Sequence, residues 1–178
     1  MNYILFDGTV RNALLPFTFT RPVADIRVGI LTIREKWEKY LGYTTTTITE
    51  EYLMDKYPMV EMEENIMINA SFLPNEILVE MVESLEENQA IFYGDEVIAF
   101  YTKDTQEEVD FDSYEVIEYT EDLLRIENPW DIFKNNDAAI REASYRGACF
   151  IANSGECKCD KPIGYFYRRR CKAGVCYS

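Results

Sequence analysis

Short apolar runs alternate along the chain with segments in which apolar residues recur every three or four positions. The first run, Tyr3–Phe6, is too short for a helix and has the length of a buried strand. Apolar or β-branched runs of similar length follow at 44–48, 65–69, 90–93, 97–102 and 114–119. Strands that alternate with helices predict an α/β fold, with a mostly parallel, Rossmann-like sheet and helices on both faces.

Two of the predicted strands are expected to form a hairpin. Gly94-Asp95 separates 90–93 from 97–102, and such a pair between two apolar runs is typical of a tight turn. We therefore expect one inserted β-hairpin in the otherwise parallel sheet.

The longest segment with helical spacing is Pro22–Tyr40, with proline at its start and Gly42 just after its end. A short helix is predicted over 49–57, another begins at Pro74, and the last covers 128–141. The residues predicted to face the core from the long helices are Val23, Ile26, Ile30, Ile33, Trp37, Leu41, Ile77, Leu78, Met81, Val82, Leu85 and Trp130.

The composition is that of a globular domain: 178 residues, 47% hydrophobic and 28% charged. No apolar run approaches the ~20 residues of a membrane span, and no signal peptide is visible, so we expect a cytoplasmic protein without a membrane partner. The chain has no histidine, which excludes Ser-His-Asp triads and histidine metal ligands.

Charge and cysteine divide the chain near residue 141. Residues 1–140 carry 10 basic and 29 acidic residues, whereas residues 141–178 carry 8 and 3 and contain all five cysteines. The acidic part argues against nucleic-acid binding. We therefore predict a domain over residues 1–141 and an irregular, basic, Cys-rich tail over residues 142–178.

The tail admits three interpretations. Cys157-x-Cys159 and Cys171-x4-Cys176 suggest a four-thiolate zinc site, although the spacing matches common zinc ribbons poorly. Disulfides are the second interpretation, and a cytosolic chain disfavours them. In the third, a frameshift after about residue 141 truncated a longer protein, which predicts a poorly ordered tail without a site.

Candidate chemistry gathers where the first strand ends. Asp7-Gly8 follows that strand, and Arg11 lies in the loop after it. Ligands of parallel sheets bind at the carboxyl ends of strands, where backbone N–H groups favour anions. The candidate phosphate-binding residues are Arg11 and Arg21. Further candidate ligand-binding residues are Asp7, Gly8, Thr20 and Asn69.

Structural roles compete with each of these assignments. Asp7 is also a residue that caps a strand end in a turn, and Asn69 also suits a strand-end amide that bonds to the backbone. Arg21 has an acidic neighbour four residues later, Asp25, with which it could pair on a helix.

Several short motifs together resemble one enzyme family, the sugar-1-phosphate nucleotidyltransferases. The resemblance covers about residues 1–141, and it is closer to a divergent bacterial branch similar to the N-terminal domain of the bifunctional N-acetylglucosamine-1-phosphate uridyltransferase/glucosamine-1-phosphate acetyltransferase. The residues that carry it are Phe6-Asp7-Gly8, Arg11, Leu15-Pro16-Phe17-Thr18-Phe19-Thr20-Arg21-Pro22, Asn69-Ala70, Leu73-Pro74 and Asn128-Pro129-Trp130.

The resemblance implies a uridyltransferase or thymidylyltransferase reaction. A sugar-1-phosphate, expected to be hexosamine-1-phosphate, would join a nucleoside triphosphate to give a nucleotide-sugar such as UDP-N-acetylglucosamine, with release of pyrophosphate. Such catalysis is mostly positioning and cationic stabilisation, which arginine and Mg²⁺ supply. The resemblance thus implies a catalytic role for Arg11 and Arg21, and nucleotide binding by Asp7, Gly8, Thr20 and Asn69.

Two departures from the family pattern keep a second interpretation open. The family's lysine after Leu-Pro is here Phe17, and its metal-binding aspartate at the end of a central strand is here Asn69. The alternative is a catalytically degenerate domain of a truncated two-domain protein, which binds a nucleotide-sugar or serves in assembly.

Overall fold

The computed structural model describes residues 2–103, 109 and 111–152. The chain divides into two compact units, Met1–Tyr145 and Arg146–Ser178, and all strands of the sheet belong to the first. Four of the five cysteines lie outside the described residues, as do the zinc, disulfide and frameshift interpretations of the tail. Among the described residues, no helix has both the length and the apolar character needed to cross a membrane.

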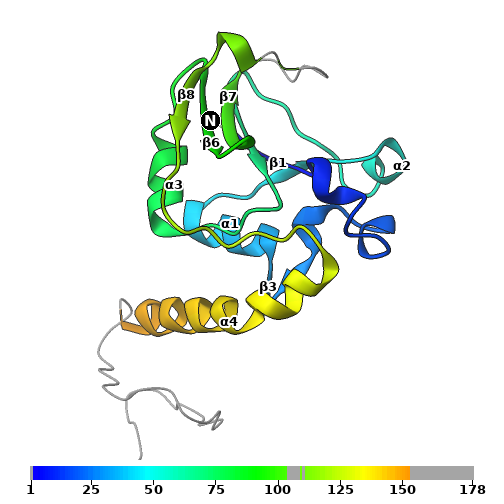
Figure 1. The fold of residues 1–178 in the computed structure, drawn as a ribbon, viewed down its shortest axis with the longest axis vertical. Coiled ribbons are helices and arrows are strands. Elements are labelled where there is room, and N and C mark those ends of the chain that lie inside the picture. The colour runs from blue at the N-terminus through cyan, green and yellow to red at the C-terminus, as the bar shows by residue number, and fades with distance from the viewer. Residues whose placement is uncertain (1, 104–108, 110, 153–178) are drawn as a thin grey trace, which may run out of the picture. The chain divides into compact units, whose positions relative to one another are not determined.

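The centre of the first unit is a six-stranded sheet in the order β4-β1-β5-β7-β6-β8 (Figure 1). β1 lies between β4 and β5 and is parallel to both, β6 is parallel to β8, and β7 is antiparallel to β5 and β6. The strands are β1 Asn2–Phe6, β4 Thr46–Ile48, β5 Asn65–Asn69, β6 Gln89–Tyr93, β7 Glu96–Thr102 and β8 Glu115–Glu118. The prediction of a mostly parallel α/β sheet with one hairpin is confirmed.

The larger part of the core covers one face of this sheet. Alternate residues of each strand point to opposite faces, so Tyr3 and Leu5 of β1 enter the large cluster while Ile4 enters the small one. The helices α1, Ile33–Leu41, and α3, Glu76–Glu83, pack on the large cluster (Figure 1). Trp37 of α1 is fully buried there, and its indole N–H donates to the Phe72 carbonyl at 3.1 Å.

The opposite face of the sheet carries the smaller cluster. Met67 and Phe100 are buried there and are covered by Met59 and by the 3₁₀ helix η4, Phe111–Ser113. The rings of Phe100 and Phe111 meet edge to face, with centroids 5.3 Å apart. On this face, the described part of the chain thus contributes one helical turn with its flanking residues, together with Met59 from the segment between α2 and β5.

The expectation of one helix over Pro22–Tyr40 is wrong in its first half. The structure has the 3₁₀ helix η3, Val23–Asp25, then a small hairpin of β2, Arg27–Val28, and β3, Leu31–Thr32. Gly29 turns this hairpin with φ +74°, a backbone angle that a regular helix does not contain. α1 begins only after Thr32, and it ends at Leu41, one residue past the predicted end and directly before Gly42.

The remaining helices follow the predictions more closely. α2 is Glu51–Met54, α3 is capped by the side chain of Asn75, and α4 is Pro129–Ala152, which extends past the predicted end at residue 141. Two further 3₁₀ helices lie in the loop after β1, namely η1, Thr9–Arg11, and η2, Phe17–Phe19.

Three residues predicted to be buried are exposed instead. Trp130 has 66% of its surface exposed, Ile77 has 51% and Ile30 has 48%. Trp130 lies in the first turn of α4. The residues of this helix that pack in the core come later, at Ile132 and Ala139. Trp37 is the tryptophan that anchors the core.

Candidate functional site

A cavity of about 320 Å³ lies at the carboxyl ends of the parallel strands β1 and β4. We call it the Arg11 cavity. Its lining residues are Phe6, Asp7, Gly8, Arg11, Ile48, Thr49, Glu50 and Glu51. The edge of the sheet where parallel strands end is the usual place for ligands in α/β folds. The position predicted for the site from the sequence is therefore hollowed in the structure.

Gly8 connects β1 to the loop in a conformation that only glycine adopts readily. Its φ is +62° and its ψ is −172°. A Cβ built at this position would lie 3.0 Å from Oδ1 of Asn69, at the end of the neighbouring strand β5. The two candidate residues Gly8 and Asn69 are thus brought together, and the backbone of Gly8 passes close to the side chain of Asn69.

Asp7 and Arg11 form a buried ion pair at the bottom of the loop. Each has 7% of its surface exposed, and Arg11 Nη1 donates to Asp7 Oδ2. The same carboxylate oxygen accepts from the Thr49 hydroxyl at 2.6 Å, and Oδ1 accepts from the backbone N–H of Val23 at 2.7 Å. Asp7 therefore holds together β1, the end of β4 and the start of η3.

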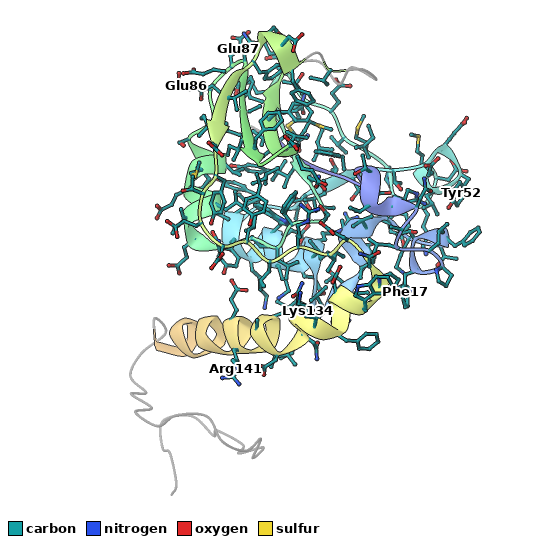
Figure 2. All side chains as sticks on the ribbon, in the orientation of Figure 1. Phe17, Tyr52, Glu86, Glu87, Lys134 and Arg141 are labelled. Atoms are coloured by element: carbon teal, nitrogen blue, oxygen red, sulfur yellow. The ribbon has the colours of Figure 1, made fainter. Side chains whose placement is uncertain are left out.

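The other nitrogens of the Arg11 guanidinium are also engaged. Nη2 donates to the Thr18 carbonyl at 2.7 Å and to the Tyr52 hydroxyl at 3.0 Å. Nε lies 3.6 Å from Oε1 of Glu50, whose side chain is 57% exposed. The guanidinium carbon is 6.0 Å from the centre of the Tyr52 ring, and Tyr52 lies on α2 beside the loop after β1 (Figure 2). With Asp7 and with the Thr49 hydroxyl, which accepts from Nη1 at 3.0 Å, Arg11 is thus oriented by five neighbours.

Asn69 lines neither of the two cavities described for this chain. Its Oδ1 accepts from the backbone N–H of Ser71 at 3.0 Å and from the Ser71 hydroxyl at 2.8 Å. Its Nδ2 donates to the Val97 carbonyl at 3.1 Å. These bonds are those of a strand-end amide that secures the backbone, which was the structural alternative for this residue.

Thr20 and Arg21 line a different cavity, with a volume of about 580 Å³. We call it the Arg21 cavity. Its lining residues are Thr20, Arg21, Asp25, Thr32, Arg34, Glu35, Lys56 and Tyr57, none of which lines the Arg11 cavity. The two candidate catalytic arginines are therefore not brought into one pocket. Asp25, the partner in the structural alternative for Arg21, pairs instead with Arg34 at 2.7 Å.

Sequence reasoning missed several polar residues of the Arg11 cavity. Thr49 bridges Asp7 and Arg11, since its hydroxyl donates to Asp7 and accepts from Arg11 Nη1 at 3.0 Å. Glu50 and Glu51 complete the lining. All three directly follow β4, a strand parallel to β1, so the rule that ligands bind at carboxyl ends of parallel strands was a signal that pointed to them.

The donor set of the Arg11 cavity can be compared with what magnesium requires. Both oxygens of Asp7 already accept hydrogen bonds, and Asn69 is directed to Ser71, so neither fits as a magnesium ligand. Within the described ranges, no three His, Cys, Asp or Glu side chains gather as a metal centre. Magnesium often binds through one or two carboxylates together with substrate phosphates, and Glu50 and Glu51 fit that mode.

Comparison with protein families identifies one match. A family model described as sugar nucleotidyl transferase matches residues 3–145. Comparison with curated proteins finds no match. The matched range contains the six-stranded sheet except for Asn2, the first residue of β1, and it contains every lining residue of both cavities.

Proposed function

The chain belongs to the sugar nucleotidyl transferase family, and on this premise we propose that it makes a nucleotide-sugar at the Arg11 cavity. A phosphate oxygen of the sugar-1-phosphate attacks the α-phosphorus of a nucleoside triphosphate. The bond from the α-phosphorus to the oxygen that bridges it to the β-phosphate breaks, and pyrophosphate leaves. The proposed substrates are UTP or dTTP and hexosamine-1-phosphate. Of these, UTP and hexosamine-1-phosphate are the substrates of the uridyltransferase branch that the N-terminal motifs resemble.

The observation that carries this proposal is the position of the Arg11 cavity. It lies where β1 and β4 end, beside a buried arginine and within the range that matches the family. In a phosphoryl transfer the protein acts mainly by positioning and by stabilising negative charge. A guanidinium held by Asp7, Thr18 and Tyr52 is already oriented before substrate arrives, so these three contacts need not be reorganised during the reaction.

The charge of the cavity determines how a triphosphate would enter it. Its lining has one cation, Arg11, against three carboxylates, those of Asp7, Glu50 and Glu51. A bare triphosphate would be repelled by this excess of negative charge. We therefore propose that the nucleotide is bound as its magnesium complex. Glu50 and Glu51 would hold the ion jointly with the phosphates, and the ion would supply charge neutralisation.

Glu50 also limits access to Arg11. Its carboxylate lies 3.6 Å from Nε of Arg11, whereas Asp7 and Thr18 accept from Nη1 and Nη2. A substrate phosphate would replace this exposed carboxylate and accept a charge-assisted hydrogen bond from Nε. Glu50 would then be released to the magnesium ion.

The test is release of pyrophosphate from UTP or dTTP with N-acetylglucosamine-1-phosphate or glucose-1-phosphate, in the presence of magnesium. We expect release only when both substrates are present. Arg11→Lys, which keeps the charge but loses the planar fork, should lower kcat/KM about a hundredfold. Arg27→Lys, at an exposed arginine outside both cavities, is the matched control and should leave kcat/KM unchanged.

A second candidate function is binding of a nucleotide-sugar without turnover. The engagement of Arg11 by five neighbours and the hydrogen bonding of Asn69 to Ser71 favour it, because both residues are used to hold the fold together. Calorimetric binding of a nucleotide-sugar, with no pyrophosphate release from any substrate pair, would select this function and reject the enzyme.

A further inference from the structure

The Arg21 cavity contains cations that the proposed reaction at the Arg11 cavity does not use. Three of its lining residues are basic, namely Arg21, Arg34 and Lys56. They come from the loop after β1, from α1 and from the segment that follows α2. Three positively charged residues from separate parts of the chain therefore converge on one hollow of about 580 Å³.

The two carboxylates of the Arg21 cavity are already engaged. Asp25 forms an ion pair with Nε of Arg34 at 2.7 Å. Glu35 accepts from the backbone N–H of Thr32 at 2.7 Å, in the cap of α1. The carboxylates thus leave Arg21 and Lys56 uncompensated: neither side chain forms an ion pair or hydrogen bond with a residue in the described ranges.

The cavity also offers groups suited to the uncharged part of a ligand. Tyr57 contributes an aromatic ring, whose centre lies 5.0 Å from Nζ of Lys56, and Thr20 contributes a hydroxyl. Its volume lies within the roughly 300–1,000 Å³ of typical small-molecule sites. An aromatic surface beside two cations that have no ion-pair partner in the described ranges favours a ligand with a ring at one end and a phosphate at the other.

We propose that the Arg21 cavity is a second binding site, which takes a small molecule with a phosphate monoester or pyrophosphate group. Arg21 would form paired hydrogen bonds with two phosphate oxygens, and Lys56 would contribute a point charge. Arg34 would remain paired with Asp25. The site goes beyond the proposed reaction, since it shares no lining residue with the Arg11 cavity.

The test is calorimetric titration of the full chain with pyrophosphate, without magnesium. The expected result is binding that is weakened about tenfold or more in the double variant Arg21→Gln/Lys56→Gln. Arg27→Gln/Lys39→Gln, which removes the same charge at exposed positions outside both cavities, is the matched control and should bind as the unmodified chain does. Circular dichroism of all variants verifies the fold.

Titrations with UTP and with glucose-1-phosphate identify the source of the phosphate. The ligand whose affinity falls in Arg21→Gln/Lys56→Gln but not in Arg11→Lys belongs to the Arg21 cavity. Equal affinities of the double variant and the unmodified chain for all three probes would overturn the proposal. A chain that binds in this pattern but releases no pyrophosphate would support the second site and reject only the proposed reaction.

Discussion

At the scale of single residues, Gly8 lines the Arg11 cavity and its backbone passes close to the side chain of Asn69. Its φ of +62° with ψ −172° is unfavourable for any residue with a Cβ, and that Cβ would lie 3.0 Å from Oδ1 of Asn69. Gly8→Ala should therefore lower the free energy of unfolding by about 2–3 kcal/mol, measured by urea denaturation.

Gly42→Ala is the control for this substitution. Gly42 has φ +73° and ψ 9°, a left-handed conformation with no atom within 4 Å of a built Cβ. Its replacement should lower the free energy of unfolding by only about 1 kcal/mol, because conformational strain is its sole penalty. Equal losses at the two glycines would contradict the role assigned to the contact of Gly8 with Asn69.

Lys36 is a buried cation, with 4% of its surface exposed and Nζ 3.5 Å from the Ala139 carbonyl of α4. Burial lowers the pKa of Lys36, and the carboxylate of Glu142 opposes this only in part. Below that lowered pKa the folded protein bears the full penalty of a buried charge. The penalty disappears as the pH rises toward the unfolded value near 10.4.

Lys36→Met should therefore stabilise the protein by about 1 kcal/mol at pH 7, and the gain should shrink as the pH approaches 10. Urea denaturation at the two pH values measures the difference. Lys39→Met, at an exposed position of the same helix, should change stability little at either pH. A gain that is the same at pH 7 and pH 10 would show that titration of Lys36 does not contribute.

At the scale of elements, the start of α1 depends on a reciprocal cap. The Thr32 hydroxyl accepts from the backbone N–H of Glu35 at 3.1 Å, and Glu35 accepts from the backbone N–H of Thr32 at 2.7 Å. Thr32→Ala should lower the free energy of unfolding by about 1 kcal/mol, whereas Thr32→Ser should preserve it. Equal stability of the alanine and serine variants in urea would rule out the cap as the cause.

The elements differ in how well their bounds could be predicted from the sequence. β5 and the hairpin of β6 and β7 were predicted almost to the residue, because each strand is an apolar run between turn residues. The first half of the helix predicted over 22–40 was wrong. Val23 and Ile26 have helical spacing and are buried, but a 3₁₀ turn followed by a hairpin places them in the core instead of a helix. The sequence signal for the true start was the pair Thr32 and Glu35, three residues apart.

At the scale of the whole molecule, only those parts of the site that follow from the arrangement of the parallel strands could be predicted. Because β1 is parallel to β4 and β5, residues at the carboxyl ends of these strands meet, and Gly8 lies beside the side chain of Asn69. The separation of Arg11 from Arg21 was not predictable. It depends on side-chain contacts over long sequence distances, such as that of Arg11 with Tyr52, 41 residues apart.

The boundary of the domain, which the sequence analysis placed near residue 141, can be tested by truncation. Every buried residue of both core clusters lies between Tyr3 and Ala139. The contacts of α4 with the rest of the first unit also precede Tyr145, since Asn136 accepts from the backbone N–H of Gly29 at 2.9 Å and Tyr40 donates to Glu142. A chain that ends at Tyr145 should therefore unfold at the same urea concentration as the full chain.

A second truncation makes this expectation specific. A chain that ends at residue 128 loses α4, exposes the surface around Gly29 that Ala139 covers, and should be destabilised by several kcal/mol or fail to fold. If the chain that ends at Tyr145 were as unstable as the chain that ends at residue 128, residues 146–178 would be part of the folded unit. If both were as stable as the full chain, α4 would not belong to the core, and the boundary would lie before Pro129.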